Sequence, residues 1–195
     1  MSQRVTELHC IMPIVNIPTV VTRGILCHDE AAKLAHHSVA MQEIQDKRDN
    51  VQVPGGLKLH QYANLYFDAR NPMMYKRQSE RDSLCVLRVN KAVMETVGAV
   101  LSDMNSVSKY VRFLAPTQIK YINFDMVFAE DWRHPGDQIS YFRHSAVKCA
   151  EVLVPHSVPF TCIQGAYVVS EAARVSLQQT GFGLDITVNP HLFFA

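Results

Sequence analysis

The sequence has few cysteines, no excess of charge of either sign and no long apolar run. Its five cysteines are odd in number and include no Cys-x-x-Cys pair, so neither a disulfide framework nor a zinc ribbon is expected. Nineteen Lys and Arg against eighteen Asp and Glu give a net charge of +1, which excludes a histone-like or polybasic binder. No window has the length and polarity of a membrane span or a signal peptide. We therefore expect a cytoplasmic protein without membrane contact.

Several motifs of common enzymes are also missing. The chain has no Gly-x-Ser-x-Gly elbow, no Gly-x-x-x-x-Gly-Lys-[Ser/Thr] loop and no Gly-x-Gly-x-x-Gly turn, which removes the usual hydrolase, P-loop and Rossmann interpretations. Nine histidines occur without a His-Glu-x-x-His motif. Because the histidines also lack carboxylates or cysteines at ligand spacing, no metal site is expected.

The sequence does contain enough apolar residues for one core. Hydrophobic residues make up 48% of the 195 positions and charged residues 19%, and this length is typical of a single domain, here residues 1–195. Apolar runs of strand length predict one buried sheet system from residues 8–11, 84–89, 150–154, 162–169 and 184–188. The pattern as a whole is mixed α+β.

Helices are predicted between these runs. Asn16 and Pro18 suit the cap and first turn of a helix that ends near Gly24, and Ser170 and Gly181 suit the cap and stop of another. Residues 30–48 carry helix formers around a polar interruption, which predicts a broken helix or a loop.

A third helix is predicted over residues 137–149. Apolar residues recur there at spacings of three and four, which puts them on one face, while Arg143 and Lys148 lie opposite. The apolar face consists of Ile139, Phe142, Ala146 and Cys149.

The segment 59–75, with the sequence LHQYANLYFDARNPMMY, is the most specific motif in the chain. A Leu-His-[Asp/Gln]-Tyr stretch leads there into an aromatic strand and then into an Asn-Pro-Met-[Leu/Met]-Tyr turn. This resembles the signature of the DarT family of DNA ADP-ribosyltransferase toxins. Four other stretches are similar to that family in the same order, so the resemblance covers nearly the whole chain: residues 8–26, 45–48, 148–155 and 188–194.

The resemblance implies a fold and an activity. The fold is an α+β, ADP-ribosyltransferase-like fold, in which two small packed β-sheets with flanking helices hold NAD in a cleft. The activity is that of an NAD-dependent mono-ADP-ribosyltransferase toxin, which transfers ADP-ribose to thymine in single-stranded DNA and releases nicotinamide. The implied partners are single-stranded DNA and a macrodomain antitoxin (DarG-like). Two alternatives stay open: a transferase that acts on RNA or protein, and a catalytically idle module that binds NAD or nucleic acid.

The resemblance also assigns two catalytic residues. Arg48 matches the family's essential arginine, and as a lasting cation it suits an anionic thymine better than it suits the role of a free base. Glu151 matches the transferase glutamate, whose carboxylate suits the oxocarbenium-like centre left when nicotinamide departs. The alternatives are a solvated charge pair of Lys47 and Arg48 at a helix end and an exposed strand carboxylate at Glu151. Contacts with NAD are carried over onto His9, Cys10, Ile11, Asn16, Arg48, Tyr66 and Glu151.

At one position the sequence departs from the family. The chain has Met12 where the family usually has Thr, which removes one side-chain hydrogen bond to the cofactor. Tyr66 also has a simpler interpretation as a residue of the core or of the cleft wall.

Nucleic-acid contacts are predicted in two segments. Residues 113–150 match the family's acceptor-recognising region by position, and they include Tyr141, Arg143 and His144. From Lys58 to Lys91 seven basic residues, among them Lys76 and Arg77, stand against three acidic ones, which favours a modest phosphate-binding patch. The alternative for this patch is an ordinary solvated surface.

Overall fold

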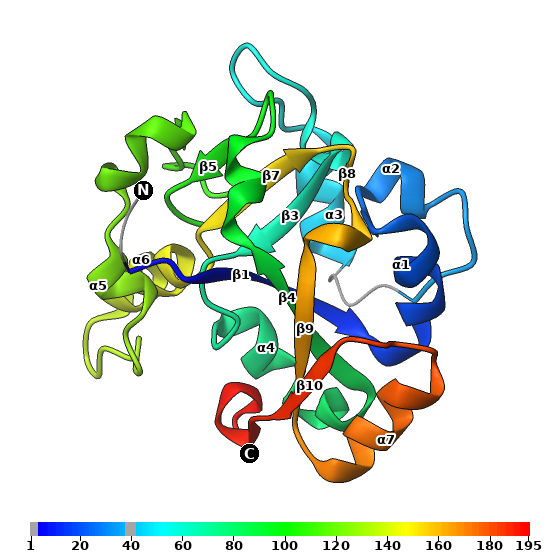
Figure 1. Ribbon diagram of the computed structural model, residues 1–195. Helices are drawn as coiled ribbons and strands as arrows, with labels where there is room; N and C mark the ends of the chain where they lie inside the picture. The colour runs from blue at the N-terminus through cyan, green and yellow to red at the C-terminus, as the bar shows by residue number, and fades with distance from the viewer. Residues whose placement is uncertain (1–3, 38–41) are drawn as a thin grey trace.

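The computed structural model describes residues 4–37 and 42–195. An eight-stranded sheet in the order β10-β9-β4-β1-β3-β7-β5-β6 crosses the molecule (Figure 1). Only β9 and β10 pair in parallel; the other neighbours are antiparallel. A second, two-stranded sheet joins β2 (Ile25–Leu26) to β8 (Ser157–Val158). The strands of the large sheet are β1 (Glu7–Pro13), β3 (Tyr62–Tyr66), β4 (Leu84–Asn90), β5 (Val100–Ser102), β6 (Phe113–Leu114), β7 (Glu151–Pro155), β9 (Ile163–Val168) and β10 (Asp185–Val188).

The five predicted strands all belong to the large sheet, as expected. Leu84, Cys85, Val86 and Leu87 of β4 are each at most 1% exposed, so this strand is covered on both faces. A strand buried on both faces has a continuous apolar sequence instead of an alternating one, and that is why the run was recognisable. The short strands β5 and β6 and the small sheet carry no comparable run and were not predicted.

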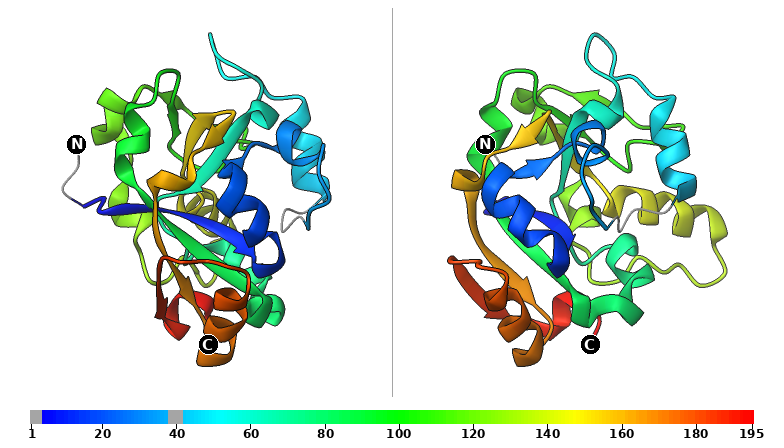
Figure 2. Two further views of the ribbon diagram at one scale, coloured as in Figure 1. Left: turned by 45° about the vertical axis from the view of Figure 1, so that its right-hand side comes forward. Right: turned by 90° about the vertical axis from the view of Figure 1, so that its right-hand side faces the viewer.

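The helices lie around the sheet (Figure 2). No described helix has both the length and the apolar character needed to cross a membrane. The α-helices are α1 (Ile17–Arg23), α2 (His28–Ala31), α3 (Gln42–Asp49), α4 (Pro72–Lys76), α5 (Phe124–Val127), α6 (Gln138–Lys148) and α7 (Glu171–Gln179). Short 3-10 turns are η1 (Ile14–Asn16), η2 (Leu59–Gln61), η3 (Gln78–Ser83), η4 (Lys91–Glu95), η5 (Pro116–Tyr121), η6 (Phe160–Cys162) and η7 (Pro190–Phe193).

Most of the predicted helix boundaries are confirmed. Ser170 caps α7 by accepting a hydrogen bond from the amide of Ala173 at 3.3 Å. The glycine at the end of α1 is required, because a Cβ on Gly24 would lie 2.2 Å from the carbonyl oxygen of Val158. The predicted broken helix over 30–48 corresponds to the end of α2 and to α3, and residues 38–41 of that prediction lie outside the described residues.

The predicted cap at Asn16 is wrong. Its side chain makes no capping hydrogen bond to α1. Instead the Asn16 amide accepts a hydrogen bond from the backbone N–H of His37 at 3.0 Å and donates one to the carbonyl of the same residue at 2.7 Å. These contacts hold the segment after α2 against the start of α1, so tertiary structure has replaced the local interaction.

The predicted orientation of α6 is also wrong. Ile139 is 82% exposed and Phe142 is 61% exposed, whereas Lys148, placed on the polar face, is 1% exposed. The helix buries His144, Val147 and Lys148 instead. Lys148 is accommodated because its ammonium group donates to a carboxylate, that of Asp68. Only Cys149 at the end of the apolar stripe is buried, and the outer part of the stripe, Ile139 and Phe142, faces solvent.

Glu7 of β1 provides a test of the fold by pH. Burial alone would raise its pKa, but hydrogen bonds from His9, Arg88 and Tyr167 outweigh this and lower the pKa to about 2. A carboxyl group whose pKa is lower in the folded state contributes stability above its unfolded value of 4.5, and this contribution is lost as the pH falls toward 2. We expect Glu7→Gln to lower the free energy of unfolding at pH 7 by about 2–3 kcal/mol. Urea unfolding from pH 7 to pH 2 checks this; parallel curves for the two proteins between pH 5 and pH 3 would contradict it.

Candidate active site

The cleft arises where two neighbouring strands separate. β1 pairs with β4 from Glu7 to Pro13, but it pairs with β3 only at His9 and Tyr66. Beyond that single pair the strands diverge, and the main-chain groups of β1 on the β3 side take no part in a ladder with β3. Backbone N–H and C=O groups at such an opening can serve a ligand amide, which needs one donor and one acceptor.

A cavity of about 280 Å³ occupies this opening. Side chains from β1, α1, α2, α3, β3 and α4 line it. The lining includes five of the seven predicted NAD contacts, namely Cys10, Ile11, Asn16, Arg48 and Tyr66, together with Met12, Met73, Lys76 and Cys149.

The two predicted catalytic side chains meet in space. Arg48, in the last turn of α3, donates from Nη1 to Oε2 of Glu151 at 3.2 Å. Glu151 is the first residue of β7 and is 1% exposed; Arg48 is 6% exposed. The two alternatives from the sequence, a solvated charge pair and an exposed carboxylate, are therefore wrong. A buried carboxylate needs a charged partner and hydrogen bonds, and Arg48 supplies both.

Two serines complete the surroundings of Glu151. The hydroxyl of Ser106 accepts from Arg48 at 2.8 Å and donates to Oε1 of Glu151 at 3.3 Å. Ser102 accepts from the backbone N–H of Glu151 at 3.2 Å. Both serines are fully buried. Neither serine could be identified from the sequence, because both reach Glu151 only through the pairing of β5 with β7 and through the loop after β5.

Tyr66 lies opposite Glu151 in the β3–β7 ladder. Burial and then the nearby Glu151 charge raise the pKa of Tyr66 well above its ordinary value. The phenol therefore stays protonated, and Tyr66 lines the cavity as a neutral group beside Glu151. Burial likewise raises the pKa of Cys10 and of Cys149 to about 12, so neither thiol is a nucleophile near neutral pH.

Two of the predicted NAD contacts, His9 and Glu151, are not part of the cavity lining, and Glu151 reaches it only through its contact with Arg48. Nε2 of His9 lies 3.2 Å from a carboxylate oxygen of Glu7, and His9 is not part of the cavity lining, which leaves only its main chain near the cleft. Met12, the departure from the family, accepts a long hydrogen bond at its sulfur from the Asn16 amide, at 3.7 Å.

The predicted nucleic-acid contacts fall into two groups. Tyr141 and Arg143 are exposed on α6, and Lys76 is exposed at the cavity. His144 is 7% exposed, with its ring nitrogens 3.0 Å from His134 and from the carbonyl of Met126. Arg77 donates to Glu80 at 2.8 Å. His144 is thus a packing residue here.

Within residues 4–37 and 42–195 no three His, Cys, Asp or Glu side chains come together as a metal site.

Comparisons with known proteins show the family of this chain. A family model described as "ssDNA thymidine ADP-ribosyltransferase, DarT" matches residues 9–194. The chain is 26% identical over 204 residues to a DNA ADP-ribosyl transferase-DNA ADP-ribosyl glycohydrolase fusion protein of Thermosipho africanus, covering 100% of this chain and 51% of the relative. The chain thus spans about half the length of that relative.

Solved structures agree with the fold. Thermosipho africanus DarTG in complex with ADP-ribose has a TM-score of 0.84 at 26% identity and covers 96% of this chain and 51% of its own. Thermus sp. 2.9 DarT in complex with ADP-ribosylated ssDNA has a TM-score of 0.83 at 21% identity and covers 99% and 98%.

The fold therefore defines an α+β protein of the ADP-ribosyltransferase type, with a sheet that opens around a cleft. Because the family model covers residues 9–194, the chain belongs to the DarT family of ssDNA thymidine ADP-ribosyltransferases. The resemblance predicted from residues 59–75 and the predicted fold class are both confirmed.

The Arg48–Glu151 pair predicts a specific instability. Arg48→Ala leaves a buried carboxylate with only a serine hydroxyl to stabilise it, so we expect the free energy of unfolding at pH 7 to fall by about 3–5 kcal/mol. The loss should shrink in acid, because a protonated carboxyl group carries no charge. Lys47→Ala is the matched control: Lys47 is the neighbour on α3 and pairs with Glu43 at the surface, and its loss should leave stability nearly unchanged. Equal effects of the two substitutions in urea unfolding would show that the buried pair is not formed.

Proposed function

We propose that this protein is an NAD-dependent mono-ADP-ribosyltransferase that transfers ADP-ribose from NAD to thymine in single-stranded DNA and releases nicotinamide. The observation that carries the proposal is the buried contact of Arg48 with Glu151 behind a cleft whose wall contains Cys10, Ile11 and Tyr66. Membership of the DarT family supplies the acceptor class.

The first chemical step breaks the bond between nicotinamide and the ribose. The bonding electrons leave with nicotinamide, and positive charge develops on the ribose carbon. A preorganised carboxylate in a site with little water stabilises such a charge strongly. Glu151 is the carboxylate in this position, and Ser106 and Ser102 hold its side chain and backbone in place.

The second step forms the bond to thymine. In thymidine the only ring N–H is the one between the two carbonyl groups, because the other ring nitrogen carries the sugar. This nitrogen gives up its proton to solvent water, and its electron pair forms the new bond to the ribose carbon, so the ring carries negative charge only until that bond has formed. Arg48 keeps its positive charge at any ordinary pH, so its role is to stabilise that anion and to hold NAD beside Glu151.

The acceptor strand is expected to run along α6. Tyr141 and Arg143 are exposed there, and so are Ile139 and Phe142 on the stripe that continues from Cys149 at the cavity. Aromatic side chains stack unpaired bases with little sequence preference, and a cation nearby attracts phosphate. Lys76 at the cavity belongs to the same face in this proposal.

The partner is expected to be a macrodomain antitoxin (DarG-like) that removes the adduct. The Thermosipho relative, named as a fusion of a transferase and a glycohydrolase, extends to about twice the length of the matched part. Because a bulky adduct on thymine blocks base pairing, the transferase would act as the toxin of the pair.

Replacing the glutamate tests the reaction. We expect Glu151→Gln to reduce transfer at least about 10²–10³-fold, because a neutral amide no longer stabilises the developing cation. Intact mass spectrometry of thymine-containing DNA oligonucleotides, RNA oligonucleotides and the protein itself after incubation with NAD measures the gain of one ADP-ribose on each. The matched control is Glu171→Gln, an exposed glutamate at the start of α7. Transfer to RNA or protein alone would identify another acceptor, and no transfer at all would favour the idle binding module.

A second substitution tests the acceptor surface. We expect Phe142→Ala to raise the KM for a ten-nucleotide DNA about 10-fold, the scale of one lost stacking contact, with the KM for NAD unchanged. Phe142→Trp should keep the wild-type value. Val175→Ala, which changes an equally solvent-exposed apolar residue on α7, is the control. A Phe142→Ala protein with wild-type KM for DNA would remove α6 from the acceptor site.

A further inference from the structure

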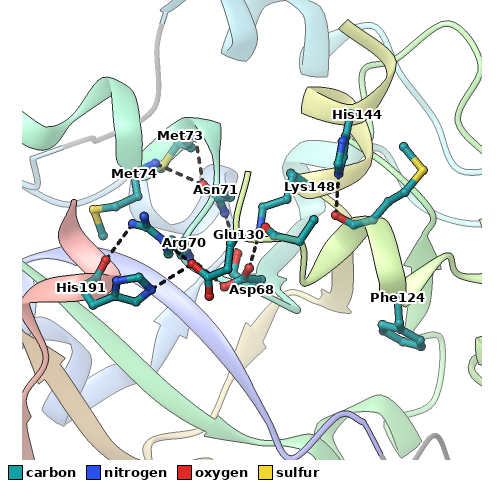
Figure 3. Close-up of polar contacts among 12 residues, drawn as sticks. Asp68, Arg70, Asn71, Met73, Met74, Phe124, Glu130, His144, Lys148 and His191 are labelled. Carbon is teal, nitrogen blue, oxygen red and sulfur yellow. Dashed lines mark hydrogen bonds and ion pairs between the residues drawn. The ribbon is translucent and has the colours of Figure 1, made fainter. Parts of the chain in front are cut away.

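A second buried ion pair lies beside the first and has no part in the chemistry just described. Lys148 is 1% exposed, and its ammonium group donates to Oδ2 of Asp68 at 2.5 Å and to the carbonyl of Ala129 at 3.0 Å (Figure 3). The same nitrogen lies 5.8 Å from the centre of the Trp132 ring. Three separate parts of the chain thus meet at one buried charge.

The burial of this lysine is not explained by stability. Removing an ammonium and a carboxylate from water is unfavourable, and an apolar pair of the same size often does as well or better. What such a pair supplies is one defined geometry, here reinforced by a second hydrogen bond on each side, from Lys148 to the carbonyl of Ala129 and from the Arg70 N–H to Asp68 at 2.9 Å.

The pair lies where the β3–β7 ladder ends. Tyr66 is paired with Glu151, and the next backbone contact is a long hydrogen bond from Phe67 N–H to the carbonyl of Ala150, at 3.4 Å. The ladder stops there. Asp68 lies just after the end of β3, and Lys148 lies just before the start of β7. Their ion pair joins the strands at the point where backbone hydrogen bonds no longer do.

The connection continues from Asp68 to the cavity wall. The Asn71 amide donates to the Asp68 carbonyl at 2.8 Å, and its oxygen accepts from the N–H groups of Met73 and Met74 at 2.9 and 3.1 Å, which caps α4 (Figure 3). Asn71 is fully buried. Met73 and Lys76 of this helix line the cavity. The position of α4 therefore depends on a turn that Lys148 holds.

The other end of the connection is the catalytic strand. Lys148 is the last residue of α6, three positions before Glu151, and Cys149 between them lines the cavity. The pair thus links the segment that delivers Glu151 to the segment that delivers the α4 wall. Active-site groups must be held within about 0.5 Å of their productive positions by such surrounding contacts.

We propose that Lys148 is a positioning residue for NAD. Through Asp68 and the capped turn at Asn71, it fixes the distance between the α4 wall of the cleft and the strand of Glu151. The inference rests on the proposed function insofar as NAD is the ligand, but it concerns binding and not transfer.

The test compares single and double substitutions. Lys148→Met and Asp68→Asn each leave a buried charge without its partner, whereas the double variant leaves none and should regain most of the melting temperature. The dissociation constant for NAD, measured by calorimetry, should rise about 10-fold or more in the single variants and stay raised in the double variant. The kcat at saturating NAD should change less than about 3-fold, because Arg48 and Glu151 keep their contact.

A matched pair on the other side of β1 serves as control. Arg88 donates to Glu7 at 2.9 Å in a partly buried pair away from the cavity, and Arg88→Met should lower the melting temperature without changing NAD affinity. Wild-type NAD affinity in the double variant would overturn the inference, since the pair would then act only on stability. If Lys148→Met alone does not fold, the double variant decides. A wild-type protein that binds NAD but transfers nothing contradicts the proposed function and leaves this comparison valid.

Discussion

β1 is held to β4 along its whole length and to β3 at a single residue pair, and the site depends on that difference. The ladder with β4 makes β1 rigid, so the opening toward β3 is a fixed gap and not a loose edge. β7 pairs with the other edge of β3, which places Glu151 opposite Tyr66, one strand behind the gap. β1 and β3 therefore line the cleft together with α1, α2, α3 and α4.

The electrostatics follow from this position. A glutamate in the middle of a sheet is removed from water, and its charge is tolerable only with a cation and hydrogen bonds around it. Arg48 from α3, and Ser102 and Ser106 from the end of β5 and the loop after it, provide these. The Lys148–Asp68 pair meets the same requirement a few residues away. In both cases the buried charge costs stability and fixes one arrangement of the strands. A site that breaks a bond needs such a fixed arrangement.

The sequence alone could predict those elements whose own residues determine them. The buried strands β4 and β7 carry unbroken apolar runs at residues 84–87 and 152–154, and α7 carries its cap and its stop, so local pattern and final structure agree. Arg48 and Glu151 were found by resemblance, since no spacing rule joins residues 103 positions apart. Ser102 and Ser106 could not be found, because a serine acquires its role here from strand pairing alone. Asn16 failed as a cap because a better partner, His37, is brought to it by the fold.

The apolar residues of α6 show why its predicted orientation is wrong. Ile139, Phe142, Ala146 and Cys149 do share one face, as the spacing requires, but burial is distributed along that face in an unusual way. Cys149 lines the cavity, whereas Phe142 and Ile139, further out, are exposed to solvent. An amphipathic helix normally turns its apolar stripe to the core; this one turns lysine inward and pairs it. A large exposed apolar patch often marks an interaction site; in the proposed function Ile139 and Phe142 contact the acceptor strand, and the stripe leads from them to Cys149 at the cavity.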